Sequence, residues 1–562
     1  MTTTVGSFLA TRLAQLGILR HFVVPGDYNS NLLDQLRQHT ELSEITCTNE
    51  LNCSFAAEGY ARARGIAACV VTYGVGALSA FNGIASAYAE NLPVILISGA
   101  PNTNDREAFH SVHHSLDNGD FDFQLDMARR ITCAAVSIRR AADAPRLIDQ
   151  AVKSARLLRK PAYIEIPVNM AREPCSLAGP PSAVLERRGS DVLGLDAATK
   201  KAMEFLRKWE SVTILVGPKV RPAGAEKALL ELAETMGCAV TVQPAAKSMF
   251  PESHPQFAGV YWGGASTLGA EEVVEWSDAV VCVGTIFTDY STAGWTAVPA
   301  AANRITIGLD QVTVPGAEWN DVLMKDFLSQ LAAKLPHGPK SLVEEHPRRG
   351  SDRIAPLRAH GGSTLTRKEI SRQIEDLLTP ESTLFVDIGD SWFDAAQMAL
   401  PPGARVELQM QWAHTGWSIP AAFGYALGAP DRKVMVLVGD GAFQMTAQEV
   451  SQMTRYQTAI SLFVINNRGY TVDVEIGDGY VNNIKNWDYT TFLDAVNSDD
   501  GYGRGFKVTK AGELQQAIER GLVNRRGPTL LECYIDRADC SRELVVWGHL
   551  LGEANRRQPA VF

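Results

Sequence analysis

The chain has 562 residues, of which 46% are hydrophobic and 21% charged, and its formal net charge is −10. One hydrophobic core rarely serves such a length, so three or four domains are expected. The acidic balance and the lack of a long basic run argue against a nucleic-acid binder. No apolar stretch reaches membrane-spanning length, and the N-terminus shows no secretory signal pattern. Nine cysteines without a CxxC pair indicate a reducing cytoplasm.

Short apolar runs alternate with amphipathic stretches from the N-terminus onward, which predicts an α/β fold with parallel sheets. In the first part of the chain, strands are expected at residues 21–24, 44–50, 67–72 and 93–98. A helix is expected over residues 51–64, between the second and third of these strands. This part is the predicted N-terminal domain, residues 1–180.

Two segments rich in glycine, proline and arginine indicate linkers, at about residues 176–196 and 336–364. They divide the rest of the chain into a predicted middle domain, residues 195–340, and a C-terminal domain, residues 360–562. Expected strands of the middle domain are 212–216, 239–242, 279–283 and 305–307, and those of the C-terminal domain are 384–387, 434–438, 462–465 and 529–533. The fold class is therefore three successive α/β domains with parallel sheets.

The most informative motif follows the predicted strand 434–438, where Gly439-Asp440-Gly441 stands at the strand end. A helix is expected over 446–456, and the next strand ends at Asn467. Asp440 and Asn467 should therefore meet at the carboxyl edge of one sheet, where open α/β folds bind ligands. Side-chain oxygens beside glycines suit a small cation that bridges to a diphosphate. Alone, Asp440 could equally be a helix cap.

A second group of candidate residues lies in the predicted N-terminal domain. Glu50 ends the predicted strand 44–50 and suits proton exchange, although an acid at a helix N-terminus is an alternative of similar weight. Asp27 also follows a strand end, where an Asx turn or a helix cap is the alternative. His113 and His114 are adjacent and outside any clear element. They could be a surface pair or a metal pair, but no cysteine or carboxylate stands at ligand spacing.

The paired Gly-Asp-Gly and Asn-Asn motifs resemble the thiamine-diphosphate motif. Together with Asp27, His113 and His114, they make the chain similar to the pyruvate decarboxylase family of 2-keto-acid decarboxylases. Further similar segments are Tyr73–Ser79, Ala89–Pro93, Thr446–Glu449 and Asn483–Tyr489. The resemblance implies a pyrimidine-binding and a diphosphate-binding domain that flank the middle domain. It also implies the decarboxylation of a 2-keto acid, with pyruvate as the preferred substrate, to an aldehyde and CO₂. The enzyme would be a cytoplasmic homodimer or homotetramer with sites at the dimer interface.

The resemblance also assigns roles to residues. Mg²⁺ would be held by Asp440, Asn467 and the Gly469 carbonyl. The catalytic set would be Glu50, Asp27, His113, His114 and Asp473. Thiamine diphosphate would be held by Glu50, Asp390, Ala413, Thr415, Gly439, Asp440, Gly441, Ala442, Asn467, Gly469 and Tyr470. The pocket for the substrate would be lined by Tyr290, Ile388, Trp392, Val472, Ile476 and Trp547.

Several positions depart from the family pattern. Asp473 stands where the family carries a catalytic glutamate, so its acid arm is one methylene shorter. Thr415 replaces a bulky apolar residue that wedges the cofactor, and Ala413, Ile388 and Ala442 replace a glycine, a threonine and a hydroxyl residue. These changes leave three alternatives open: a decarboxylase for larger phenylpyruvate-like or branched-chain keto acids, an acyloin-forming carboligase, and an inactive cofactor-binding assembly subunit.

Overall fold

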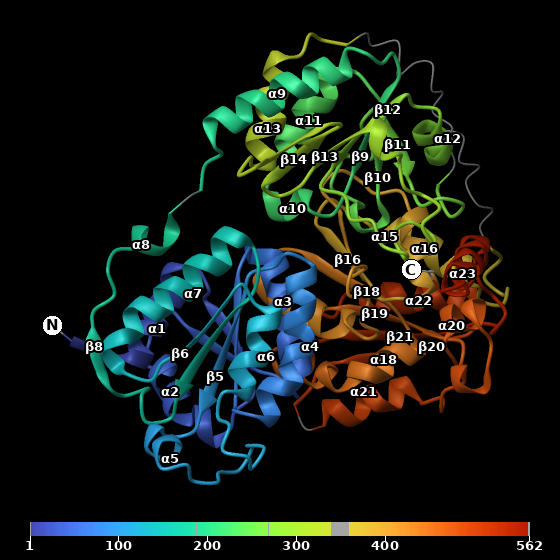
Figure 1. Cartoon of the computed structure of the whole chain (residues 1–562). Coiled ribbons are helices and arrows are strands. Elements are labelled where there is room, and N and C mark those ends of the chain that lie inside the picture. Colours follow the sequence, from blue (N-terminus) through green and yellow to red (C-terminus); the bar gives the residue numbers. More distant parts are fainter. Residues whose placement is uncertain (1, 187, 268, 339–358, 499, 560–562) are drawn as a thin grey trace.

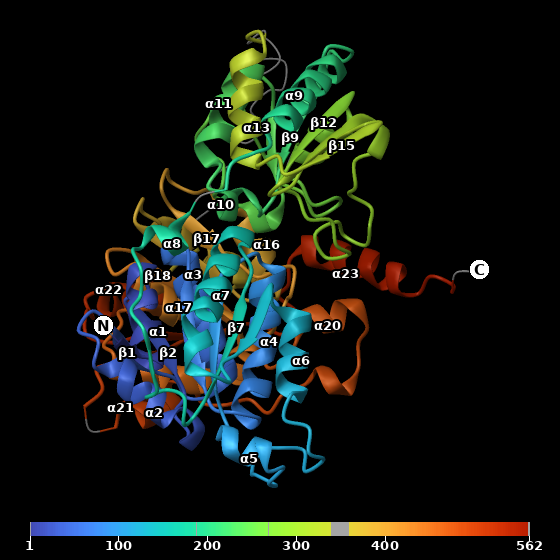
Figure 2. The ribbon, with the colours of Figure 1, turned by 60° about the vertical axis from the view of Figure 1, so that its left-hand side comes forward.

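The computed structural model describes residues 2–186, 188–267, 269–338, 359–498 and 500–559. The chain forms three α/β units, each built around one sheet, which confirms the predicted fold class. In Figure 1 the N-terminal unit (blue to teal) and the C-terminal unit (orange to red) lie side by side, with the middle unit (green) above them; Figure 2 shows the same arrangement from another side. The domain limits remain predictions, and residues 339–358 of the second predicted linker lie outside the described residues.

The N-terminal unit contains a six-stranded parallel sheet in the order β3-β2-β4-β5-β7-β6. Its strands are β2 (Arg20–Val23), β3 (Ser43–Thr46), β4 (Ala67–Val71), β5 (Val94–Ala100), β6 (Ala134–Ser137) and β7 (Ala162–Pro167). The helices of this unit are α1 (Val5–Gln15), α2 (Asp27–Arg37), α3 (Glu50–Arg64), α4 (Val75–Ala89), α5 (Thr103–Glu107), α6 (Phe123–Ile131) and α7 (Ala144–Leu158).

The middle unit has a seven-stranded sheet in the order β11-β10-β9-β12-β13-β14-β15, parallel except for the hairpin at β14 and β15. Its strands are β9 (Val212–Val216), β10 (Val240–Val242), β11 (Phe257–Val260), β12 (Ala279–Val283), β13 (Arg304–Ile307), β14 (Gln311–Val314) and β15 (Ala317–Asn320). The longest helices that cover it are α9 (Val192–Leu206), α11 (Glu226–Met236) and α13 (Met324–Lys334).

The C-terminal unit has a six-stranded parallel sheet in the order β17-β16-β18-β19-β21-β20. Its strands are β16 (Ser382–Val386), β17 (Arg405–Glu407), β18 (Lys433–Gly439), β19 (Ser461–Asn466), β20 (Arg504–Val508) and β21 (Thr529–Tyr534). Its helices include α15 (Arg367–Leu377), α16 (Asp390–Gln397), α17 (Ser418–Gly428), α18 (Asp440–Thr446), α19 (Val450–Arg455), α20 (Thr471–Ile476), α21 (Tyr489–Asn497), α22 (Ala511–Gly521) and α23 (Arg542–Asn555). Among the described residues, no helix is long and apolar enough to cross a membrane.

Two sequence predictions at the site were wrong in their element boundaries. The strand expected over 44–50 ends at Thr46, and Glu50 is the first residue of α3. The reason is a helix cap: the Asn49 side chain accepts a hydrogen bond from the backbone N–H of Asn52 at 2.9 Å. The α-helix in the range expected over 446–456 is shorter, because α19 begins at Val450 after a 3₁₀ turn at Ala447–Glu449, and the helix α18 before it was not predicted.

Helices α3 and α17 join the N-terminal and C-terminal units at a very close crossing. Gly59 faces the backbone of Ala421, and Gly424 faces the backbone of Ala56, so closely that a Cβ atom at either glycine would overlap the opposite carbonyl. Both helices are almost wholly buried there and belong to one apolar core that extends into both sheets. The two units are therefore packed together backbone to backbone.

Candidate active site

A cavity of about 190 Å³ opens at the carboxyl edge of the C-terminal sheet. Strands β16, β18 and β19 all end there, so the parallel topology brings the loops after them to one place. Most of the residues predicted to hold a cofactor line this cavity: Asp390, Ala413, Thr415, Gly439, Gly441, Ala442, Asn467, Gly469 and Tyr470. A side chain at Gly441 would overlap the Tyr470 ring, so only glycine fits beneath it.

Asp440 lies behind the cavity wall as the first residue of α18, fully buried. One carboxylate oxygen accepts the backbone N–H of Gly441 at 2.8 Å, and the other accepts the N–H of Arg468. Burial raises the pKa of the Asp440 carboxyl to about 6, against the opposing effect of these amide donors. Removal from water is thus the dominant influence on the pKa of the Asp440 carboxyl.

The Asn467 amide faces two other oxygens, and this allows a test of cation binding. With its nitrogen turned toward them, the amide donates to Gly469 O at 3.1 Å and to Asp440 Oδ1 at 3.2 Å, while its oxygen accepts from Thr471. With the amide turned the other way, the Asn467 oxygen faces the Gly469 carbonyl oxygen and Asp440 Oδ1 at these spacings. Three oxygens so close together repel one another unless a cation lies among them. Neighbouring ligands of an octahedral Mg²⁺ stand roughly 3 Å apart. The donor set therefore fits a small hard cation.

The loop that carries Ala413 and Thr415 is held from both sides. The buried Asp387 carboxylate accepts the backbone N–H of Gly416 at 2.9 Å and that of Ser418 at 2.9 Å. The Thr446 hydroxyl donates to the Gly416 carbonyl at 2.6 Å. These bonds fix the position from which Ala413 and Thr415 reach the cavity.

Asp390 and Arg367 form an ionic group on the cavity wall. Arg367 approaches Asp390 at 3.3 Å and also pairs with Asp394, and Asp390 accepts the Ser541 backbone N–H at 2.7 Å. Burial raises the pKa of the Asp390 carboxyl. Arg367 was not among the predicted site residues, since it stands just after a helix cap, where a solvated arginine is the ordinary expectation. The other unpredicted lining residues are Gly389, Ser391, Asp394, Ile465, Thr471, Ile535 and Asp539.

The six predicted substrate-pocket residues divide into two layers. Tyr290, Ile388 and Val472 line the cavity itself. Trp547 and Trp392 lie behind Tyr290, with ring centroids 5.0 Å and 6.2 Å from it, and Trp547 donates to the Tyr290 carbonyl at 3.0 Å. The sixth, Ile476, packs against the same apolar cluster. The tryptophans therefore fix Tyr290, a residue of the middle unit, at the mouth of the C-terminal cavity.

Asp473 lies on α20 and lines the cavity. Partial burial raises the pKa of its carboxyl. Glu475 does not line the cavity, and its backbone faces Gly548 of α23. Asp473 is therefore the acidic side chain of α20 that a ligand in the cavity would meet.

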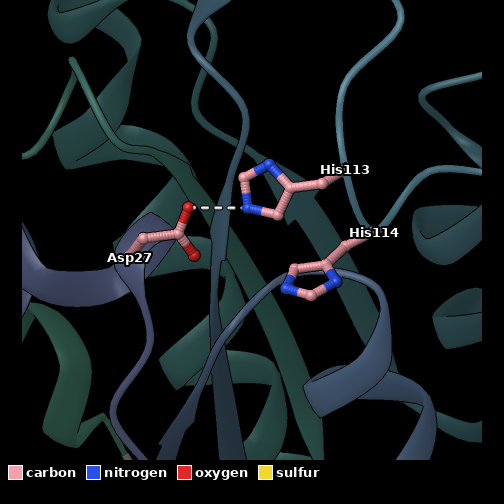
Figure 3. A group of neighbouring side chains, drawn as sticks. All are labelled: Asp27, His113 and His114. Carbon is pink, nitrogen blue, oxygen red and sulfur yellow. Dashed lines mark ion pairs between the residues drawn. The ribbon is translucent and has the colours of Figure 1, made fainter.

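Asp27, His113 and His114 come together on the N-terminal unit, as Figure 3 shows. Asp27 is the first residue of α2, and the histidines stand in the loop between α5 and α6. Asp27 Oδ2 lies 2.7 Å from His113 Nε2, and the two histidine rings are 4.6 Å apart. Tyr28 stacks on His113 with its hydroxyl 3.2 Å from Nδ1. The fold thus supplies the carboxylate that sequence spacing did not reveal.

Within one chain the predicted site residues form two separate groups. The cavity is lined by Tyr290 and by residues between 367 and 539, with none from the N-terminal unit. Glu50 lies with the N-terminal group, at the start of α3, where Gly76 leaves room for its carboxylate: a Cβ on Gly76 would be 3.1 Å from Glu50 Oε1. One chain therefore presents two separate groups of predicted site residues, one on the N-terminal unit and one around the cavity.

Comparison with known proteins matches each unit to a described domain. Residues 3–124 match the thiamine pyrophosphate enzyme N-terminal TPP-binding domain, residues 199–331 the central domain and residues 387–533 the C-terminal TPP-binding domain. Pyruvate decarboxylase of Neurospora crassa is 56% identical, covering 99% of this chain and 97% of its own length. A probable pyruvate decarboxylase of Schizosaccharomyces pombe is 54% identical with the same coverage, and pyruvate decarboxylase 2 of Arabidopsis thaliana is 41% identical over 99% of this chain and 92% of its own.

The fold and these matches define a thiamine pyrophosphate (thiamine diphosphate) enzyme. Within that class the chain belongs to the pyruvate decarboxylase family.

Proposed function

We propose that this chain catalyses the non-oxidative decarboxylation of pyruvate to acetaldehyde and CO₂. The observation that carries the proposal is the Asp27–His113–His114 cluster, which stands on a chain that is more than half identical to pyruvate decarboxylases over nearly its full length. Proton-transfer groups of this kind suit a reaction that must protonate a carbon after CO₂ has left. Nine cysteines without disulfides support a cytoplasmic location.

Thiamine diphosphate would supply the electron sink that decarboxylation of a 2-keto acid requires. We propose that Asp440, Asn467 and the Gly469 carbonyl hold Mg²⁺, which would anchor the diphosphate in the cavity. The support is the convergence of their three oxygens and the burial of the Asp440 carboxylate, which pairs with no cationic side chain among the described residues. Gly439 and Gly441 leave the backbone open to the phosphates.

The side chains divide the remaining work. Glu50, with the space that Gly76 leaves, would exchange a proton with the pyrimidine ring. Asp473, whose pKa is raised by partial burial, would exchange a proton near the reacting carbon. His113, paired with Asp27, and His114 would move protons between solvent and the site. Tyr290, Ile388 and Val472 leave room for a short keto acid.

We propose that the working enzyme is at least a homodimer, in which the N-terminal half-site of one chain faces the cavity of the other. Exposed apolar side chains flank both half-sites: Val75 and Leu78 on α4 beside Glu50 and His114, and Met445 on α18 beside the cavity loop. Covering these side chains would remove apolar surface from water and complete the site at the same time.

A product assay tests the reaction. Purified protein with thiamine diphosphate, Mg²⁺ and pyruvate should release CO₂ and acetaldehyde in equal amounts. Release of CO₂ with mostly acetoin, or turnover only of larger keto acids, would contradict the proposal.

Mixing two inactive variants tests whether each active site is shared between two chains. Glu50→Gln and Asp440→Asn chains should each be inactive alone. After joint unfolding and refolding, half of the dimers should pair one chain of each kind, and each such dimer keeps one intact site. About a quarter of wild-type activity should therefore return. A mixture that stays inactive, with dimers of both kinds demonstrated, would show that each site belongs to one chain.

A further inference from the structure

We infer that Asp27, His113 and His114 form a zinc-binding site, and that zinc bound there switches the enzyme off. One carboxylate oxygen and two imidazole nitrogens lie within 4.8 Å of one another (Figure 3). Among the described residues, no second group of three histidine, cysteine, aspartate or glutamate side chains has this spacing. Zinc binding is inferred from this geometry alone, whereas inhibition of the enzyme by zinc also rests on the proposed function.

The chemistry of the donors selects the metal. Two imidazoles and one carboxylate, with a fourth position open to water, form a typical donor set for Zn²⁺ in proteins. Imidazole nitrogens attract Zn²⁺ and its transition-metal neighbours but hold Mg²⁺ poorly. The all-oxygen group of Asp440, Asn467 and Gly469 has the opposite preference. The two sites should therefore load different ions.

The surroundings of His113 prepare it as a ligand. Tyr28 stacks on the ring at 4.7 Å with an interplanar angle of 15°, and its hydroxyl contacts Nδ1. This leaves Nε2 directed at Asp27. A hydrogen bond to the second ring nitrogen is the usual way in which proteins orient a metal-binding histidine. His114 is held by its left-handed backbone, φ 64°, and by packing of its carbonyl on Gly74.

Small side-chain movements suffice to close the site. Ligand atoms around a tetrahedral Zn²⁺ stand roughly 3.3 Å apart, given bonds of about 2.0 Å. The Asp27–His113 separation of 2.7 Å must widen slightly, and His114 must approach. The Asp27 and His113 side chains are 57% and 58% exposed within one chain, so the chain itself leaves room for this adjustment. A bound ion would occupy the nitrogen and oxygen lone pairs that proton transfer needs.

Cobalt(II) provides a direct readout, because tetrahedral Co²⁺ absorbs visible light. Holoenzyme saturated with thiamine diphosphate and Mg²⁺ should bind one further Co²⁺ per chain with such a spectrum, and Zn²⁺ should displace it. His114→Gln should weaken this binding more than about 100-fold. His110→Gln is the matched control, because His110 lies on the same loop and pairs with Asp105 at 3.0 Å but belongs to no group of three such ligands in the part of the chain that the structure describes. It should bind as the wild type does.

Inhibition is measured on the same preparation. Zn²⁺ should abolish pyruvate turnover, EDTA followed by Mg²⁺ should restore it, and additional Mg²⁺ alone should not. Unchanged Co²⁺ binding in His114→Gln, or relief by Mg²⁺, would overturn the inference, the latter by placing zinc at Asp440. If wild-type protein binds Co²⁺ at this site but turns over no keto acid, the proposed function fails and the metal site stands.

Discussion

The Tyr28 phenol and the His113 imidazole lie face to face, 4.7 Å apart, and the Tyr28 oxygen is 3.2 Å from His113 Nδ1. Because Asp27 contacts the other ring nitrogen, both nitrogens of His113 have a defined partner. The arrangement fixes the ring orientation of the residue that would move protons in the proposed reaction.

Tyr28→Phe should therefore lower kcat by about fivefold, the effect of one lost hydrogen bond of about 1 kcal/mol, and should shift the pH profile of kcat. Tyr73→Phe is the matched control: Tyr73 packs edge-on against Tyr28, but its hydroxyl donates to the Phe121 carbonyl. Steady-state kinetics across pH measure both variants. Equal effects of the two substitutions would show that the hydrogen bond from Tyr28 to His113 has no special part in catalysis.

Asp473 is the acid that reaches the cavity from α20, with an arm one methylene shorter than in the family pattern. Asp473→Glu should raise kcat several-fold, because displacement of a catalytic group by about 1 Å can cost on the order of 100-fold. Asp473→Asn should lower kcat on the order of 100-fold or more. Glu475→Gln serves as the control and should leave kcat unchanged. A slower Asp473→Glu enzyme would show that the cavity is shaped around the shorter side chain.

Removal of the metal should release the cofactor. Chelation, or the substitution Asp440→Asn, should weaken thiamine diphosphate binding by on the order of 100-fold, since the diphosphate then faces a buried site without a bridging cation. Isothermal titration measures this without any need for turnover. Asp431→Asn, at the opposite edge of the same sheet, should bind the cofactor normally. Tight binding to metal-free protein would contradict the assigned ligands.

The crossing of α3 and α17 should tolerate no added atom. Gly59→Ala would place a Cβ against the Ala421 carbonyl and should cost about 2 kcal/mol of stability. Gly189→Ala, at a position with no heavy atom within 4 Å of the new Cβ, should have little effect. Urea unfolding of both variants compares them. Equal stability would mean that the helices can separate without loss.

His21 should make the protein sensitive to acid. Burial, with Arg37 nearby, lowers the pKa of His21 from 6.5 to about 4. Between these values the unfolded chain binds a proton that the folded chain does not, so stability falls as pH falls from 6.5 toward 4 and is constant above 6.5. The full effect is about 3 kcal/mol. His21→Leu should reduce the stability lost between about pH 7.5 and about pH 4.5; an unchanged loss would assign the acid sensitivity to other groups.

The sequence predicted the sheets well, because buried parallel strands are continuous apolar runs. The expected strands 212–216 and 279–283 coincide with β9 and β12. Helix starts were harder to predict. Asn49 caps α3 through a single side-chain hydrogen bond, and the glycines around Asp440 disguise a helix that begins at Asp440 itself.

The site was predictable where topology alone positions a residue. Gly439 ends β18 and Asn467 follows the adjacent parallel strand β19, so the two residues necessarily share an edge of the sheet. The contact of Asp27 with His113 joins residues far apart in sequence, through a loop whose course no local pattern encodes. The layering of Trp392 and Trp547 behind Tyr290 likewise depends on how the middle unit docks on the C-terminal unit.

The contact between Gly59 and Ala421 also limits how this enzyme can be recombined. A chimaera that takes one cofactor-binding domain from a relative must match small residues on both helices, or the backbones cannot meet. A foreign domain with a larger side chain at either position would tilt and, in the proposed dimer, carry Glu50 of one chain out of line with Asp440 of its partner. Exchange of the middle domain meets the same kind of limit, because Gly294 faces the Leu550 backbone on α23 so closely that a Cβ would lie 2.6 Å from the Leu550 carbonyl oxygen.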